Sequence, residues 1–135
     1  MKNLLLTVLA FGLLSSSAFA QEGLEKKQWT RVVASRAKTR IGFFYALHPD
    51  CTASGDVTLR VTKQPEHGTA ETMATTNYPN YPKENIRLKC NEHKVRGMQI
   101  SYKSAEKYVG DDTLDLLVLF PAGTAWEVHY DISVR

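Results

Sequence analysis

TLDLLVLFPAGTAWEVHYDISVR, residues 113–135, is the stretch that decides the fold class of this chain. From 126 to 135 apolar and polar residues alternate, with five apolar side chains in one series: Trp126, Val128, Tyr130, Ile132 and Val134. This is the period of a β-strand with one buried and one solvated face. The turn 121–123, Pro-Ala-Gly, separates it from a second apolar run, 114–120. We expect that run to form a central strand covered on both faces.

Shorter segments of the same kind lie upstream. The segments 56–63, 85–90 and 98–102 alternate apolar with polar residues, and the aromatic-rich run 41–47 is apolar throughout. Turn-forming residues separate them, and two prolines confine 78–82 to an extended loop. The stretch 28–34 reads as an edge strand or, less readily, as a short helix. The pattern predicts an all-β fold, an immunoglobulin-like β-sandwich of about seven strands.

The N-terminus has the three parts of a secretory signal over residues 1–20. Lys2 is followed by the apolar run 4–14 and by an Ala-x-Ala cleavage pattern that ends at Ala20. The run is too short for a transmembrane anchor, and no later run is long enough to span a bilayer. We therefore expect an exported protein, periplasmic or secreted, with no membrane span after signal cleavage and one β-sandwich domain over 21–135.

The two cysteines, Cys51 and Cys90, predict one disulfide bond. An even cysteine count in an oxidising compartment favours pairing, whereas a redox or metal pair would need a C-x-x-C spacing that is absent. On the chain-entropy model, closing such a loop stabilises a fold by about 4 kcal/mol.

Charge is concentrated in a basic leading segment, 21–40. The formal net charge of the chain is +3. Arg36 and Lys38 in this segment are candidate contacts for an anionic partner, and a solvated face is the alternative explanation. No aromatic residues interleave with the basic ones in the manner of a nucleic-acid-binding surface, so we expect no nucleic-acid partner.

Two short motifs resemble a known family. Pro65-Glu66-His67-Gly68-Thr69 follows the alternating strand 57–61, and Tyr108-Val109-Gly110-Asp111-Asp112 follows Tyr102 and precedes the strand 114–116. The order resembles the cadherin-like and other immunoglobulin-like repeats of bacterial exported and cell-surface proteins over roughly residues 55–135. Those repeats generally occur in tandem and lack a disulfide, and this chain differs in both respects. The resemblance therefore implies the fold and not an adhesive role.

Each motif residue also has a structural explanation. His67 is explained by the turn it occupies. Gly68 and Gly110 are each expected to supply the positive φ of a turn. Asp111 or Asp112 would bond backbone amides at the turn.

Metal and catalytic sites have weaker support. Glu127, His129 and Asp131 share one strand face, but neighbours two apart on a strand lie nearly 7 Å apart, so a zinc or copper site would need another strand. Asp111, Asp112 and Asp115 could bind calcium, although they lack the Asp-x-Asp-x-Asp spacing of a dedicated loop. None of the four histidines forms a helical zinc motif, and no nucleophile elbow is present. We expect no enzymatic activity and no cofactor, with calcium left open.

The loop 77–85 is the most suggestive surface feature, because Tyr78 and Tyr81 stand among its prolines. Tyrosine is a favoured interface anchor, and proline lowers the entropy cost of ordering a loop; alternatively, the rings cover the end of the sandwich. We therefore expect a non-enzymatic binding module that engages a cell-envelope protein or polysaccharide through loops. The alternatives are a periplasmic protein that binds calcium, zinc or copper, and a small hydrolase or inhibitor.

Overall fold

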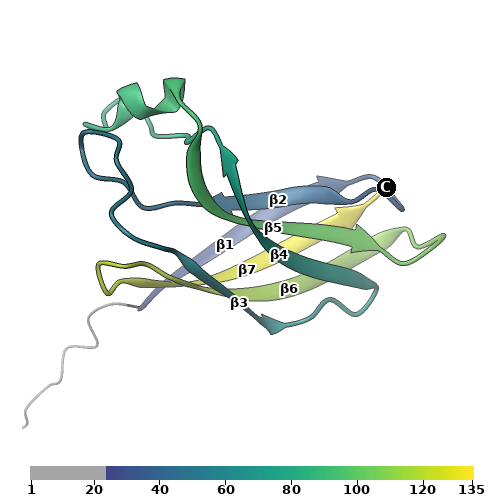
Figure 1. Ribbon diagram of the computed structural model, residues 1–135. Coiled ribbons are helices and arrows are strands. Elements are labelled where there is room, and N and C mark those ends of the chain that lie inside the picture. The colour runs from purple at the N-terminus through teal and green to yellow at the C-terminus, as the bar shows by residue number, and fades with distance from the viewer. Residues whose placement is uncertain (1–23) are drawn as a thin grey trace, which may run out of the picture.

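The computed structural model describes residues 24–135, so the predicted signal peptide lies outside the described residues. The elements are β1 (Leu24–Val33), β2 (Thr39–Phe44), β3 (Thr58–Lys63), β4 (Gly68–Asn77), the short 3-10 helix η1 (Leu88–Glu92), β5 (Val95–Ser104), β6 (Gly110–Leu119) and β7 (Ala125–Val134). One sheet has the order β1-β7-β6-β3 and the other the order β2-β5-β4. Figure 1 shows the two sheets layered face to face. The predicted all-β, immunoglobulin-like sandwich is confirmed.

The β6–β7 hairpin forms the centre of the larger sheet. β7 pairs antiparallel with β6 and parallel with β1, which makes β1 an edge strand. The alternate apolar residues of the hairpin are buried, as the sequence period predicts, and all are at most 1% exposed: Leu114, Leu116, Val118, Val128, Tyr130, Ile132 and Val134. The outer face of β6 corrects one expectation. Leu117 and Leu119 are only half-buried, because a two-layer sandwich covers each sheet on one face.

Two segments differ from the sequence-based expectation. The alternation in 85–90 predicts a strand, but the segment forms turns and the start of η1, with Ile86 71% exposed and Leu88 42% exposed. The Asn85 side chain accepts the Arg87 N–H at 2.8 Å and bends the chain away from extended structure. Conversely, β4 carries no apolar alternation. It is a mostly exposed edge strand that is held by its antiparallel pairing with β5.

Asp112 is buried and joins β6 to β5 and to the β3–β4 turn. Its Oδ1 accepts the N–H of Glu66 at 3.0 Å and that of Thr113 at 2.9 Å. Its Oδ2 accepts the N–H of His67 at 3.0 Å and the hydroxyl of Tyr102 at 2.8 Å. A desolvated carboxylate requires such donors, and here they come from β5, β6 and the β3–β4 turn. Asp112 therefore binds backbone amides, as expected. The amides of Glu66 and His67, however, belong to the turn of the other motif.

The two motif glycines have different roles. Gly110 has φ +140°, as expected. Gly68 does not have a positive φ, which corrects the prediction for it. A Cβ on Gly68 would lie 2.5 Å from the Lys103 carbonyl oxygen and 2.8 Å from the Tyr102 ring, so glycine is needed there for close approach. Beside it, the His67 ring stacks on Tyr108 with centroids 4.1 Å apart.

The two fully buried tyrosines should respond in opposite ways to loss of the hydroxyl. Tyr102→Phe removes a donor from buried Asp112 and should lower the free energy of unfolding by about 1–2 kcal/mol. The Tyr130 hydroxyl is buried without a hydrogen-bond partner among the described residues, so Tyr130→Phe should leave stability unchanged or raise it. Urea unfolding at pH 7 measures both. Equal losses in the two variants would contradict this assignment.

Alkaline pH should destabilise the fold through the same two residues. Burial raises the pKa of Tyr102, and the hydrogen bond to Asp112 raises it further; burial also raises the pKa of Tyr130, against a smaller opposing effect of Arg31. Tyrosines in the unfolded chain titrate near pH ~10. The stabilisation is therefore complete below that pH and is lost as pH rises above it. Urea unfolding from pH 8 to pH 11 should decline less steeply in a Tyr102→Phe/Tyr130→Phe variant, and an equal decline would refute the explanation.

Candidate functional site

The sandwich has two different ends. The short connections 34–38, 64–67 and 105–109 lie at one end, with the C-terminus. The longer loops 45–57 and 78–94 and the turn 120–124 lie at the other end, where Figure 1 shows η1. The second end carries the disulfide, and we call it the disulfide end.

The ends separate the four side chains predicted to bind a partner. Tyr78 and Tyr81 lie at the disulfide end, whereas Arg36 and Lys38 lie in the β1–β2 connection at the opposite end. Arg36 has φ 66°, and its backbone N–H donates to the Ser104 hydroxyl at 2.9 Å. Lys38 forms an ion pair with Glu71. The structure therefore does not bring the basic and the tyrosine candidates together into one site.

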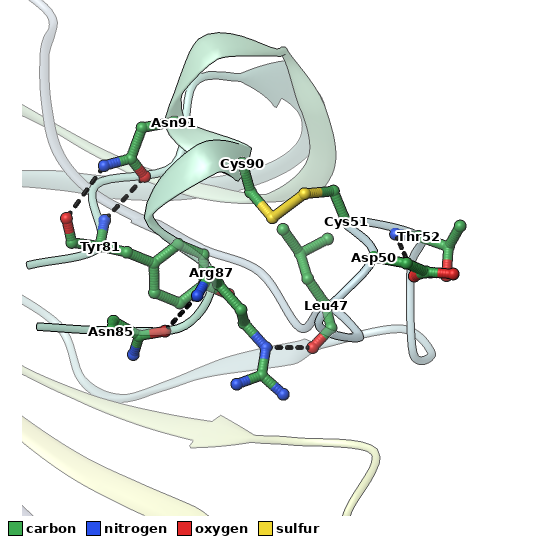
Figure 2. The surroundings of a disulfide bond; sticks show 9 residues. All are labelled: Leu47, Asp50, Cys51, Thr52, Tyr81, Asn85, Arg87, Cys90 and Asn91. Carbon is green, nitrogen blue, oxygen red and sulfur yellow. Dashed lines mark hydrogen bonds between the residues drawn. A yellow bond between two sulfur atoms is a disulfide. The ribbon is translucent and has the colours of Figure 1, made fainter. Parts of the chain in front are cut away.

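The predicted disulfide is present and joins two loops (Figure 2). Cys51 lies in a tight turn, where its N–H donates to the His48 carbonyl at 2.9 Å, and Cys90 lies in η1 with no exposed surface. A second link lies close by. The Arg87 Nε donates to the Leu47 carbonyl at 2.8 Å. Both contacts join the loop 45–57 to the loop 78–94.

Further hydrogen bonds fix the loop 77–85, which contains Pro79 and Pro82. The Asn91 side chain accepts the N–H of Tyr81 at 2.8 Å and donates to its carbonyl at 2.9 Å, a two-way contact shown in Figure 2. The N–H of Asn80 donates to the Tyr45 hydroxyl at 2.8 Å, and Pro79 is buried. The loop is therefore ordered before any ligand arrives, which lowers the entropy cost of binding.

Between these loops and the 120–124 turn lies an open cleft of 570 Å³. We call it the aromatic cleft, and its lining is Tyr45, Ala46, Leu47, His48, Ser54, Tyr81, Arg87, Phe120, Pro121, Ala122, Thr124 and Trp126. The rings of Tyr45 and Tyr81 meet edge-on at 5.3 Å, as do those of Phe120 and Trp126 at 4.8 Å. All four residues are only half-buried, so the cleft offers aromatic surface to a ligand.

The two cleft tyrosines are neutral at physiological pH. Burial raises the pKa of Tyr45, against a smaller lowering by the Asn80 N–H. Burial also raises the pKa of Tyr81, and Tyr45 adds to the increase, whereas Arg87 opposes it. Both hydroxyls therefore keep their protons and can donate hydrogen bonds.

A second hollow shares part of its lining with the first. This sheet-edge groove, of 790 Å³, runs between the edge strands β3 and β4 and includes Ala74–Thr76 and Arg96–Met98 in its lining. Tyr45 and Ala46 line both hollows. A ligand longer than the aromatic cleft would thus find protein surface on which to continue.

The polar residues of β7, Glu127, His129 and Asp131, lie on the outer face of the larger sheet. His129 Nδ1 contacts Asp115 of β6, and its Nε2 lies 3.4 Å from Asp131 Oδ1. Gln28 Nε2 donates to the other Asp131 oxygen at 2.8 Å. The additional strand is therefore β6, which the sequence argument did not identify. Across residues 24–135, no group of three or more His, Cys, Asp or Glu side chains is arranged to hold a metal ion.

The other two metal candidates lie elsewhere. Asp112 is buried, and Asp111 beside it is exposed. In the β6–β7 register Asp111 is opposite Ser133 and Asp112 is opposite Ile132, whereas His129 is opposite Asp115. The structure does not bring His129 together with either aspartate.

Sequence reasoning found Tyr81 but missed its neighbours in the cleft. Trp126 was assigned only to the apolar series of its strand, and Arg87 to the solvated face of a strand that does not form. One signal could have located Arg87. Pairing Cys51 with Cys90 necessarily places the residues around 87 beside the loop that contains Leu47.

Comparisons with known proteins identify no family. No family model matches the chain, and no curated protein matches it. Among solved structures, the solution structure of Amebosin matches 82% of this chain and 98% of its own, with 9% identity and a TM-score of 0.41. In residues 24–135, no helix is long and apolar enough to cross a membrane.

Reduction of the disulfide should loosen the disulfide end more than the sheets. On the chain-entropy model, a loop with a sequence separation of 39 contributes about 4 kcal/mol, a large share of a small domain's stability. In a Cys51→Ala/Cys90→Ala variant, amide hydrogen exchange should accelerate most at Tyr81 and Asn91, and least at Leu114 and Leu116. Uniform acceleration would show that the bond stabilises the whole domain without organising the cleft.

Proposed function

We propose that this protein is an exported, non-enzymatic binding module that engages a cell-envelope polysaccharide or protein through the loops of the disulfide end. The aromatic cleft carries the proposal. Its volume of 570 Å³ is within the range of ligand pockets, about 300–1,000 Å³. Its lining combines four aromatic rings with a few polar groups, which is the composition expected of a recognition site.

The rigidity of the cleft supports the same function. The disulfide, the Arg87–Leu47 bond and the Asn91–Tyr81 contact hold the two loops that form one part of its lining. A preformed site binds more tightly because little ordering entropy remains to be lost. The disulfide also supports export, since such bonds persist in oxidising compartments.

The motif resemblance remains part of the proposal. Asp112 of one motif binds the turn of the other, which gives both motifs a joint structural purpose. That purpose is served at the end of the sandwich away from the cleft. Binding would therefore depend on loops that lie outside the two motifs.

Tyr81 and Tyr78 provide a matched pair for the test. Tyr81 lines the cleft, whereas Tyr78 is 53% exposed and lies outside the lining. Immobilised protein is incubated with envelope material separated into a polysaccharide and a protein fraction. We expect one fraction to be retained, with retention reduced about tenfold or more by Tyr81→Ala, the loss typical of an anchor residue, and unchanged by Tyr78→Ala.

Two outcomes would contradict the proposal. If neither fraction binds to the folded protein, it does not act as an envelope-binding module. If binding occurs but is insensitive to Tyr81→Ala, the ligand uses another surface. Circular dichroism of each variant confirms that the sandwich is intact before retention is compared.

A further inference from the structure

The aromatic cleft is cationic on one side and contains no acidic residue. Among its lining residues, Arg87 and His48 are the only side chains that can carry positive charge, and neither Asp nor Glu is present. In residues 24–135, two lysines pair with acidic side chains, Lys27 with Glu25 and Lys38 with Glu71, and Arg87 forms no ion pair. The charge of Arg87 is therefore available to a ligand, whereas His48 lies near Asp50.

Arg87 is held in position with its binding groups free. The Asn85 side chain accepts its backbone N–H, and the Leu47 carbonyl accepts its Nε–H, which restrains the orientation of the guanidinium. The two terminal nitrogens have no partner within residues 24–135, and Figure 2 shows them directed away from the loop. Two adjacent N–H donors in a fixed plane match the two oxygens of a carboxylate or phosphate group.

The rest of the cleft lining favours a ligand ring that carries C–H groups on its faces. Tyr81, Phe120 and Trp126 offer broad apolar surface beside Arg87, while Ser54 and Thr124 offer hydroxyl groups. A sugar ring has this character, because its C–H groups pack on aromatic rings and its hydroxyls bind polar side chains.

The shared lining with the sheet-edge groove favours a chain of such rings. A monosaccharide would occupy only part of the aromatic cleft, and the groove of 790 Å³ shares Tyr45 and Ala46 with it. A linear polymer seated in the cleft can extend toward the groove, whose lining carries one basic and one acidic residue, Arg96 and Asp56.

We infer that the ligand is an acidic polysaccharide, whose sugar ring packs in the aromatic cleft while its carboxylate or phosphate binds Arg87. This inference rests on the proposed function and narrows it to one ligand class. An acidic peptide would offer the same anion, and the experiment separates the two.

Isothermal titration of the purified protein, with its disulfide intact, tests the inference. The probes are tetragalacturonate, the same tetrasaccharide with its carboxyl groups reduced to alcohols, a sugar-phosphate oligomer of equal length, and an acidic tetrapeptide. We expect tetragalacturonate or the sugar phosphate to bind about tenfold or more tightly than the neutral tetrasaccharide, and whichever of the two binds identifies the anion.

Arg87→Gln should remove that preference, because it removes the charge and the paired donors. Arg87→Lys should restore only part of it, since an ammonium group cannot bind two oxygens in one plane. Arg60→Gln removes an exposed arginine of β3 outside the cleft and should leave the preference unchanged. Raising the salt concentration should weaken acidic but not neutral binding, a readout that needs no variant.

Several results would overturn the inference. Equal affinity for the acidic and neutral tetrasaccharides, or a preference that survives Arg87→Gln, would remove Arg87 as the anion-binding group. If Tyr81→Ala still abolished binding in that case, the proposed function would stand. Binding of the peptide alone would overturn the polysaccharide class and leave a protein ligand. Absence of any binding sensitive to Tyr81→Ala, from probes and envelope fractions alike, would refute both proposals.

Discussion

The hydrogen bonds to the Asp112 carboxylate are the interaction on which the rest of this sandwich depends. A buried charge is tolerated only where donors surround it, and the four donors here come from three separate parts of the chain. The β3–β4 turn passes from one sheet to the other, so binding that turn fixes the two sheets relative to each other. In the same region, the backbone at Gly68 lies close to the Lys103 carbonyl and the Tyr102 ring. The end of the sandwich that contains Asp112 thus holds the two sheets together.

The opposite end is organised by other means. There the connections are long, and the Cys51–Cys90 disulfide holds them together. At the first end, the hydrogen-bonded Asp112 carboxylate has this role. Polar side chains such as Asn91 and Arg87 bind loop backbone and leave the aromatic rings facing the cleft. This division separates stability from recognition, and it permits the loops to change without disturbing the centre at Asp112.

Sequence reasoning succeeded where local pattern and tertiary burial agree. The alternation of β7 and the apolar run of β6 report directly on the side of the sheet that faces the core. Residues 85–90 have the same alternation and no strand, because hydrogen bonding by Asn85 and the disulfide at Cys90 decide their shape. β4 was not foreseen, since an exposed edge strand needs no apolar period. The cleft was only partly foreseen, because its side chains converge from loops whose positions no local pattern encodes.

The central claim is that the disulfide end recognises the ligand and the Asp112 end does not. Mapping backbone amide chemical shifts of the protein, with and without the envelope fraction that it retains, tests this directly. The account predicts that shifts change in 45–54, 80–91 and 120–126 and remain constant in 34–38, 64–67 and 105–109. Changes concentrated in the second group of segments, or on the outer face around His129, would contradict it.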